Sequence, residues 1–252
     1  MARGGPKLDH GRRRELGQSF QDGGEHYQRV RPGYPAESAD WLVPAGALDA
    51  LDVGAGTGKF TALLVERGLS VSAVDPSADM LEQLHRLCPA VSASEGTAEA
   101  TGLADASFDV VSVAQAWHWC DPLQASTELS RVLRGRGTLG LIWNQLDTSV
   151  PWVHRLSRIM HAGDVYRPHF RPPLGPEFEG LESHVTHWED IITTADIIEL
   201  AKSRSYFLRS GESTRSKVLA NLDWYLHDQL GHAPGAELGL PYLTLTWRAV
   251  KA

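Results

Sequence analysis

A glycine-rich segment, LDVGAGTGKF at 51–60, is the strongest chemical signal in the sequence. Gly54, Gly56 and Gly58 lie between an apolar strand pattern and an amphipathic helix pattern. Glycine tolerates positive φ and lets a ligand approach the backbone, and the start of a helix offers unpaired N–H groups. Asp52 precedes the first glycine by two residues. The segment therefore predicts a ligand-binding turn.

The spacing of the glycines distinguishes between kinds of nucleotide site. It has the form G-x-G-x-G, and Lys59 stands where the dinucleotide pattern G-x-G-x-x-G has its third glycine. The phosphate-binding pattern GxxxxGK[ST] is absent as well. Asp75 ends the next apolar strand, at the place where an acid in an α/β sheet binds ribose hydroxyls. The sequence thus predicts a nucleoside ligand and disfavours NAD.

His118 is the candidate general base. It follows the apolar strand 108–116, among Trp117, Trp119 and Cys120, at the sheet edge where α/β sites form. An imidazole ionises near neutral pH, which suits proton abstraction. A structural histidine in an aromatic cluster is the alternative. Trp119 is expected to line the substrate site, with core packing as an equal alternative.

Alternating strand and helix patterns position these residues. Strands are expected over 47–53, 71–75, 90–94, 108–116 and 137–144, and helices over 19–31, 35–43, 59–68, 76–87 and 121–133. Pro76 is expected in the first turn of its helix, and Asp121 is expected to cap the last one. Because the strands are mostly apolar, the pattern predicts a parallel sheet covered on both faces.

The pattern loosens after Asn144. Helices are expected over 150–162, 193–205 and 213–230, and strands over 184–191 and 240–250. The stretch 163–182 holds four prolines and predicts a long surface loop, of a kind that often serves as a lid.

Composition excludes several classes of protein. The net charge of −7 implies no general attraction to nucleic acid or anionic membranes, and no apolar run approaches a membrane span. Cys88 and Cys120 are isolated, which argues against a zinc site or a disulfide framework and favours the cytoplasm. His154 and His161 lack a third ligand, so no metal is predicted.

Six motifs resemble those of class I S-adenosylmethionine (SAM)-dependent methyltransferases, in the methyltransferase type-11 group. In chain order they are YQRVRPGYP (27–35), LDVGAGTGKF (51–60), AVDPSADML (73–81), GTAEATGL (96–103), AQAWHW (114–119) and GTLGLIWN (137–144). The wider chain resembles a little-characterised bacterial branch of that group. The resemblance implies an α/β, Rossmann-like fold with a mostly parallel seven-stranded sheet and helices on both faces.

The domain organisation expected from these observations is simple. A flexible tail covers 1–18, and one methyltransferase domain covers 19–252. Within it we expect an N-terminal cap (19–45), a SAM-binding core (46–145) and a substrate-side part with the lid and final strands (146–252).

The resemblance also implies roles for individual residues. The glycine turn, with Ala55, would lie under the methionine part of SAM, Asp52 would orient the turn and reach the amino group, and Asp75 would hold the ribose. The remaining positions implied for the cofactor site are Tyr27, Arg31, Pro76, Thr97, Ala98, Glu99 and Gln115. Tyr27 and Arg31 would bind the SAM carboxylate, with a plain surface helix as the alternative. Thr97, Ala98 and Glu99 would meet the adenine edge, or form an ordinary turn.

The predicted activity is methyl transfer from SAM to a small-molecule acceptor, at oxygen. A carboxylate acceptor would need no base, and Arg167, Arg171 or Arg204 would then bind it, although each is also a plausible solvated charge. The alternatives are a SAM-binding regulatory module without catalysis and, less favoured, an NAD-dependent oxidoreductase. We expect no nucleic-acid or membrane partner and a monomer or homodimer, and the sequence does not identify the acceptor.

Overall fold

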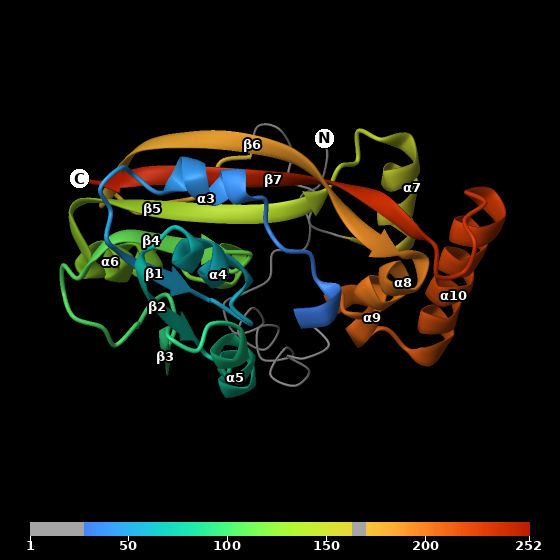
Figure 1. Ribbon diagram of the computed structural model, residues 1–252, viewed down its shortest axis with the longest axis horizontal. Helices are drawn as coiled ribbons and strands as arrows, with labels where there is room; N and C mark the ends of the chain where they lie inside the picture. The colour runs from blue at the N-terminus through green and yellow to red at the C-terminus, as the bar shows by residue number, and fades with distance from the viewer. Residues whose placement is uncertain (1–27, 163–169) are drawn as a thin grey trace.

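A seven-stranded sheet with the order β3-β2-β1-β4-β5-β7-β6 runs through the centre of the molecule (Figure 1). The computed structural model describes residues 28–162 and 170–252, so the predicted tail, Tyr27 and Arg167 lie outside the described residues. The strands are β1 (Asp49–Val53), β2 (Ser70–Asp75), β3 (Ser92–Glu95), β4 (Phe108–Ala114), β5 (Leu133–Leu146), β6 (Phe178–Thr193) and β7 (Glu237–Lys251). The helices are α3 (Ala36–Leu42), α4 (Lys59–Glu66), α5 (Ala78–Leu87), α6 (Pro122–Val132), α7 (Pro151–Ile159), α8 (Thr194–Lys202), α9 (Ser205–Arg209) and α10 (Glu212–Asp223).

The sheet is mixed, so the prediction of a mostly parallel sheet was wrong. Strands β3, β2, β1, β4 and β5 pair in parallel. β7 is antiparallel to both β5 and β6, and these two pairings are the longest in the sheet. β6 also begins inside the stretch 163–182 that was predicted as a loop. Both strands carry exposed or half-exposed residues along much of their length, as is common in antiparallel sheets.

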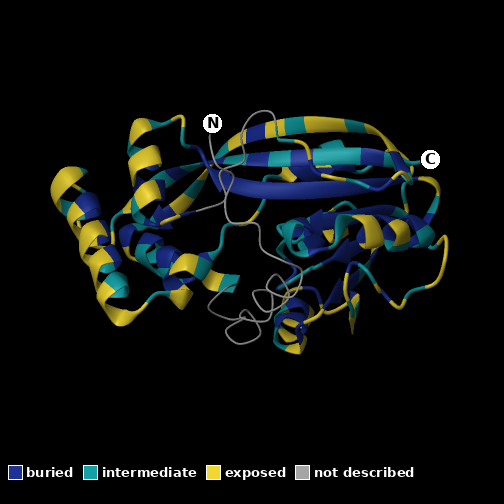
Figure 2. Ribbon diagram, turned by 180° about the vertical axis from the view of Figure 1, so that it is seen from behind, coloured by how far each residue is buried: buried dark blue, intermediate teal, exposed yellow. Residues whose placement is uncertain are grey.

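Helices cover both faces of the parallel part of the sheet, as predicted. Successive residues of a strand point to opposite faces. Val110 therefore joins the cluster built with α3, α4 and α5, while Val111 joins the cluster built with α6. Figure 2 shows the ribbon of this region as largely buried. The two covered faces hold β1 and β4 rigidly, so the loops that follow these strands are fixed in position.

A third cluster lies at the carboxyl end of β5, where α7, α8, α9 and α10 gather beside the long strands (Figure 1). Leu156 of α7, Ile197 of α8 and Leu222 of α10 are fully buried there. Tyr242 of β7 and Leu146 of β5 belong to the same cluster. The part of the chain that was predicted to lie on the substrate side is thus built on strands that belong to the central sheet.

Local capping decides where two helices begin. The Ser77 hydroxyl accepts a hydrogen bond from the Met80 N–H at 3.3 Å, so α5 begins at Ala78. Pro76 lies outside the helix, and its predicted place in the first turn was wrong. Asp121 caps α6 as predicted, because its carboxylate accepts from the N–H groups of the second and third residues that follow it.

Candidate functional site

The glycine turn joins β1 to α4 and has the conformation that only glycine adopts easily. Gly54, Gly56 and Gly58 have φ values of +65°, +54° and +87°. The Gly54 N–H donates to the Val74 carbonyl at 2.8 Å, which ties the turn to β2. A Cβ on Gly54 would lie 2.5 Å from the Cβ of Ala116, whereas a Cβ on Gly56 would meet nothing within 4 Å. The turn is therefore packed on its inner side and open at Gly56.

Asp75 lies at the end of β2 and holds the turn in place. Its carboxylate accepts from the Gly56 N–H at 2.8 Å and from the Ser77 N–H at 2.9 Å. Burial raises the pKa of Asp75, and these two hydrogen bonds oppose that shift. The acid predicted to hold a ribose thus lies directly beside the predicted ligand-binding turn. Contact with the ribose itself stays a prediction.

Asp52 is fully buried beneath the turn. Its carboxylate accepts from the hydroxyl groups of Thr61 and Ser112, each at 2.7 Å. Burial raises the pKa of Asp52 to about 6, although these two hydrogen bonds oppose the shift. These bonds connect β1 to α4 and β4, so Asp52 supports the turn from below. Its predicted contact with the amino group of a ligand stays a prediction.

The segment predicted to meet an adenine follows β3. Thr97 and Ala100 exchange two backbone hydrogen bonds, and Ala98 is buried. The Glu99 carboxylate accepts from the Asp121 N–H at 2.8 Å, at the start of α6. The segment is thus anchored to its neighbouring helix, and its role toward adenine stays a prediction.

His118 lies in a short 3-10 turn, Trp117–Trp119, that follows β4. Its ring lies 4.5 Å from the ring of Trp119, at an angle of 51°. Burial of the neighbouring Cys120 raises the pKa of its thiol to about 12, so it is not a ready nucleophile. The aromatic cluster that the sequence suggested is present, and the catalytic role of His118 stays a prediction.

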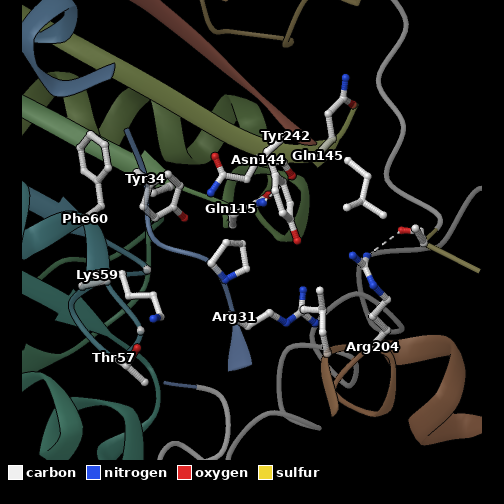
Figure 3. Close-up of a pocket in the computed structure, with 18 residues that line it drawn as sticks. Arg31, Tyr34, Thr57, Lys59, Phe60, Gln115, Asn144, Gln145, Arg204 and Tyr242 are labelled. Atoms are coloured by element: carbon white, nitrogen blue, oxygen red, sulfur yellow. Dashed lines mark hydrogen bonds between the residues drawn. The ribbon is translucent and has the colours of Figure 1, made fainter. Parts of the chain in front are cut away.

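A cavity opens at the carboxyl ends of β1, β4 and β5, bordered by the N-terminal segment, α8 and β7 (Figure 3). Its lining residues are Arg31, Pro32, Tyr34, Gly54, Ala55, Gly56, Thr57, Lys59, Phe60, Ala114, Gln115, Asn144, Gln145, Leu146, Ala162, Leu200, Arg204 and Tyr242. The cavity thus brings together five of the residues predicted to bind the cofactor, namely Arg31, Gly54, Ala55, Gly56 and Gln115. It also includes Arg204, one of the arginines considered for a carboxylate acceptor, whereas the other described candidates, His118 and Trp119 included, are not part of its lining.

Cationic groups and the buried phenol of Tyr242 line this cavity. The Arg31 guanidinium donates to the Ser203 carbonyl at 2.9 Å, and that of Arg204 donates to the Ala162 carbonyl at 3.2 Å. Tyr242 is 2 % exposed, and its hydroxyl finds no hydrogen-bond partner among residues 28–162 and 170–252. Burial raises the pKa of Tyr242 to about 12, which keeps the phenol protonated. A buried hydroxyl without a partner favours a ligand oxygen in this place.

Two amide side chains stiffen the wall opposite the turn. Gln115 has a φ of +56° and donates from its side chain to the Asn144 carbonyl at 2.8 Å. Asn144 donates to the Gly33 carbonyl at 2.7 Å and accepts from the Thr244 hydroxyl at 2.6 Å. This network connects the N-terminal segment, β4, β5 and β7 around the cavity.

Sequence reasoning missed several lining residues. Asn144 was detectable, because it is a polar residue at the end of a predicted apolar strand. Tyr242 was not, because it lies on the antiparallel strand whose position the sequence did not predict. Lys59 was considered only as an obstacle to NAD binding, yet it lines the cavity, and burial lowers its pKa.

The remaining sequence predictions concern metals and membranes. Within 28–162 and 170–252, no three His, Cys, Asp or Glu side chains lie close enough to hold a metal ion. None of the helices in the same described ranges is long and apolar enough to cross a membrane.

Comparisons with known proteins identify relatives of the chain. A family model described as a methyltransferase domain matches residues 51–141. An uncharacterized methyltransferase of Mycobacterium tuberculosis is 44 % identical over 243 residues, which cover 95 % of this chain and 98 % of the relative. The structure of a putative type II methyltransferase from Anaeromyxobacter dehalogenans covers 88 % of this chain and 97 % of its own, with 27 % identity and a TM-score of 0.67. A malonyl-[acyl-carrier protein] O-methyltransferase of Enterobacter lignolyticus is 37 % identical over 126 residues, 48 % of this chain and 50 % of its own.

Proposed function

Because the chain belongs to the class I SAM-dependent methyltransferases, in the type-11 group, we propose that it methylates a carboxylate oxygen of a small-molecule acceptor. One observation carries the choice of acceptor. Arg204 and the unpartnered hydroxyl of Tyr242 line the same cavity as the glycine turn, in addition to Arg31, which is assigned to the carboxylate of SAM. Guanidinium groups and a phenol are donors that a carboxylate accepts from, and arginine binds carboxylates in short, charge-assisted pairs.

The residues beside the turn fit the cofactor. The open side of the turn at Gly56 admits the close approach of a ligand to the backbone, and Asp75 lies next to it. In this proposal the turn and Gln115 hold the methionine part, Asp75 holds the ribose, and Thr97, Ala98 and Glu99 border the adenine. When bound, SAM supplies a methyl group already attached to a good leaving group.

The protein's own contribution is to bind and orient the acceptor. A carboxylic acid with an ordinary pKa of about 4 is already ionised at neutral pH, so it needs no base. Arg204 neutralises one part of its charge, and Tyr242 donates a hydrogen bond from a buried position. Holding the acceptor oxygen in line with the methyl group can supply much of the rate enhancement. The relative from E. lignolyticus is named as an O-methyltransferase, which supports oxygen as the acceptor atom.

The experiment is a transfer assay with tritiated-methyl SAM and a panel of mono- and dicarboxylic acids, alcohols and amines. We expect product only with carboxylic acids, and we expect mild base to release the label as volatile methanol, because methyl esters hydrolyse under these conditions. A base-stable methylated product would exclude a carboxylate acceptor. Complete absence of transfer, together with tight SAM binding, would favour the regulatory module.

A second measurement separates a carboxylate from a hydroxyl acceptor. A hydroxyl must lose its proton, and a general base contributes about 10²–10⁴-fold to such a step. We therefore expect His118→Ala to keep most of its kcat with a carboxylate acceptor. A loss of a hundredfold or more, with unchanged SAM affinity, would restore His118 as the base and disfavour the carboxylate.

A further inference from the structure

A second hollow in the described structure is a groove among α7, α9 and α10, at the helical end of the molecule (Figure 1). Its lining residues are Pro151, His154, Arg155, Arg158, Ile159, His161, Tyr206, Thr214, Lys217, Val218 and Asn221. The groove shares a wall with the cavity of the glycine turn. Ala162 and Arg204 face that cavity, whereas His161 and Tyr206 line the groove. The two hollows are therefore adjacent but have no lining residue in common.

The groove concentrates positive charge in a protein of net charge −7. Arg155, Arg158 and Lys217 line it, and no carboxylate lines it among the residues that the structure describes. Arginines elsewhere on the described surface commonly have acidic partners, such as Arg86 with Glu82. Within 28–162 and 170–252, no carboxylate forms an ion pair with the three groove cations, which leaves their charge for an external anion.

Aromatic contacts hold the groove in shape. The Arg155 guanidinium lies 5.4 Å from the ring centres of both Trp224 and Tyr225. The His161 ring stacks on Tyr206 at 3.9 Å and 22°. His161 follows α7 with a φ of +49°, a position where glycine is usual, and a side chain there extends into the groove. The cations are thus presented from a built surface rather than from a loose loop.

We propose that this groove binds a phosphate-bearing anion, a phosphomonoester or a diphosphate. Three cations facing one hollow match a group with close to two negative charges, as a phosphate ester has at neutral pH. Arginine donates in pairs to phosphate oxygens, and lysine adds a point charge. Thr214 and Asn221 on α10 supply further donors beside Lys217. This ligand is independent of the acceptor proposed for the cavity of the glycine turn.

The test is isothermal titration calorimetry of the full chain, saturated with S-adenosylhomocysteine, against inorganic pyrophosphate and against glycerol 3-phosphate. We expect one site for at least one of these two probes, and the tighter probe identifies the diphosphate or the monoester class. The variant R158E/K217E should weaken binding about tenfold or more, because it replaces charged donors with repelling groups. R158K/K217R keeps the charges and should bind within about twofold of wild type.

Two control variants test whether the phosphate probes bind in the groove rather than elsewhere on the protein. R86E/R136E changes the net charge equally at exposed positions outside the groove and should bind like wild type. Lys59→Gln removes a cation of the other cavity away from the shared wall and should also bind like wild type. The proposal is overturned if wild type binds neither probe, if R158E/K217E binds normally, or if Lys59→Gln alone abolishes binding. Binding of poly-L-glutamate without binding of either phosphate probe would also overturn it, in favour of an acidic protein partner.

Discussion

Asp75 is the acid that the sequence predicted at the end of the second strand, and the structure places it beside the glycine turn. Its carboxylate already accepts from Gly56 and Ser77, so it orients the turn in which the cofactor is proposed to bind. The position of Asp75 could be predicted because the strand, the turn and the acid are close in sequence. Arg204 and Tyr242 could not be placed in the same way, because the chain reaches them only after β6 and the helices that follow it.

Asp75→Asn should lower the affinity for S-adenosylhomocysteine about tenfold or more, because hydrogen bonds to a charged group contribute about 1.5–3 kcal/mol. Calorimetry well below the melting temperature measures this effect. Ser77→Ala is the matched control, since it removes the cap of α5 at the same corner and keeps the carboxylate. An unchanged Kd for Asp75→Asn would refute the ribose role.

Tyr242→Phe should separate stability from activity. The hydroxyl is buried and finds no partner among the described residues, so its removal should leave the free energy of unfolding unchanged or raise it by about 1 kcal/mol. The same variant should raise the KM for the acceptor, because the proposed hydrogen bond is lost. Urea unfolding and steady-state kinetics measure the two effects. A clear loss of stability would mean that the hydroxyl has a structural partner.

At the scale of elements, the sequence predicted the order of strands and helices along the chain up to β5. It did not predict that β7 and β6 complete the sheet as antiparallel strands. Residues 240–250 alternate between apolar and polar over LTLTW, which is typical of a strand with one exposed face. The alternation predicts a strand but not its direction or its neighbours. β7 lies between β5 and β6 through pairings across long sequence separations, and local patterns do not specify such pairings.

The glycine turn offers a prediction about this junction between β1 and α4. Gly54→Ala forces a Cβ against Ala116 at 2.5 Å and keeps a positive φ, so it should destabilise the protein by about 2–4 kcal/mol. Gly56→Ala has only the positive φ to accommodate and should cost about 1–2 kcal/mol. Its methyl group lies in the open space proposed for the cofactor, so SAM affinity should fall more than stability does. Equal stability of the two variants would contradict this account of the turn.

At the scale of the whole molecule, three apolar clusters share one set of strands. β5 contributes Leu139 and Leu141 to the cluster under α6, Ile142 to the opposite face and Leu146 to the cluster of the helical end. A strand that is buried in all three clusters connects their stabilities. The cavity of the proposed acceptor site is lined by members of two of these clusters, Phe60 from the cluster with α4 and Leu200 and Tyr242 from the helical end, so its residues come from distant parts of the chain.

We therefore expect the described part of the chain, 28–162 and 170–252, to unfold as one cooperative unit. Leu129→Ala in α6 and Leu222→Ala in α10 each remove a fully buried side chain and should cost about 2–5 kcal/mol. If the clusters are coupled through β5, both variants should shift one urea transition, with far-UV circular dichroism and tryptophan fluorescence coincident. Trp143 reports on the sheet, and Trp188 packs against the helical end. Two separate transitions, with Leu222→Ala moving only one of them, would show instead that the helical end is an independent domain.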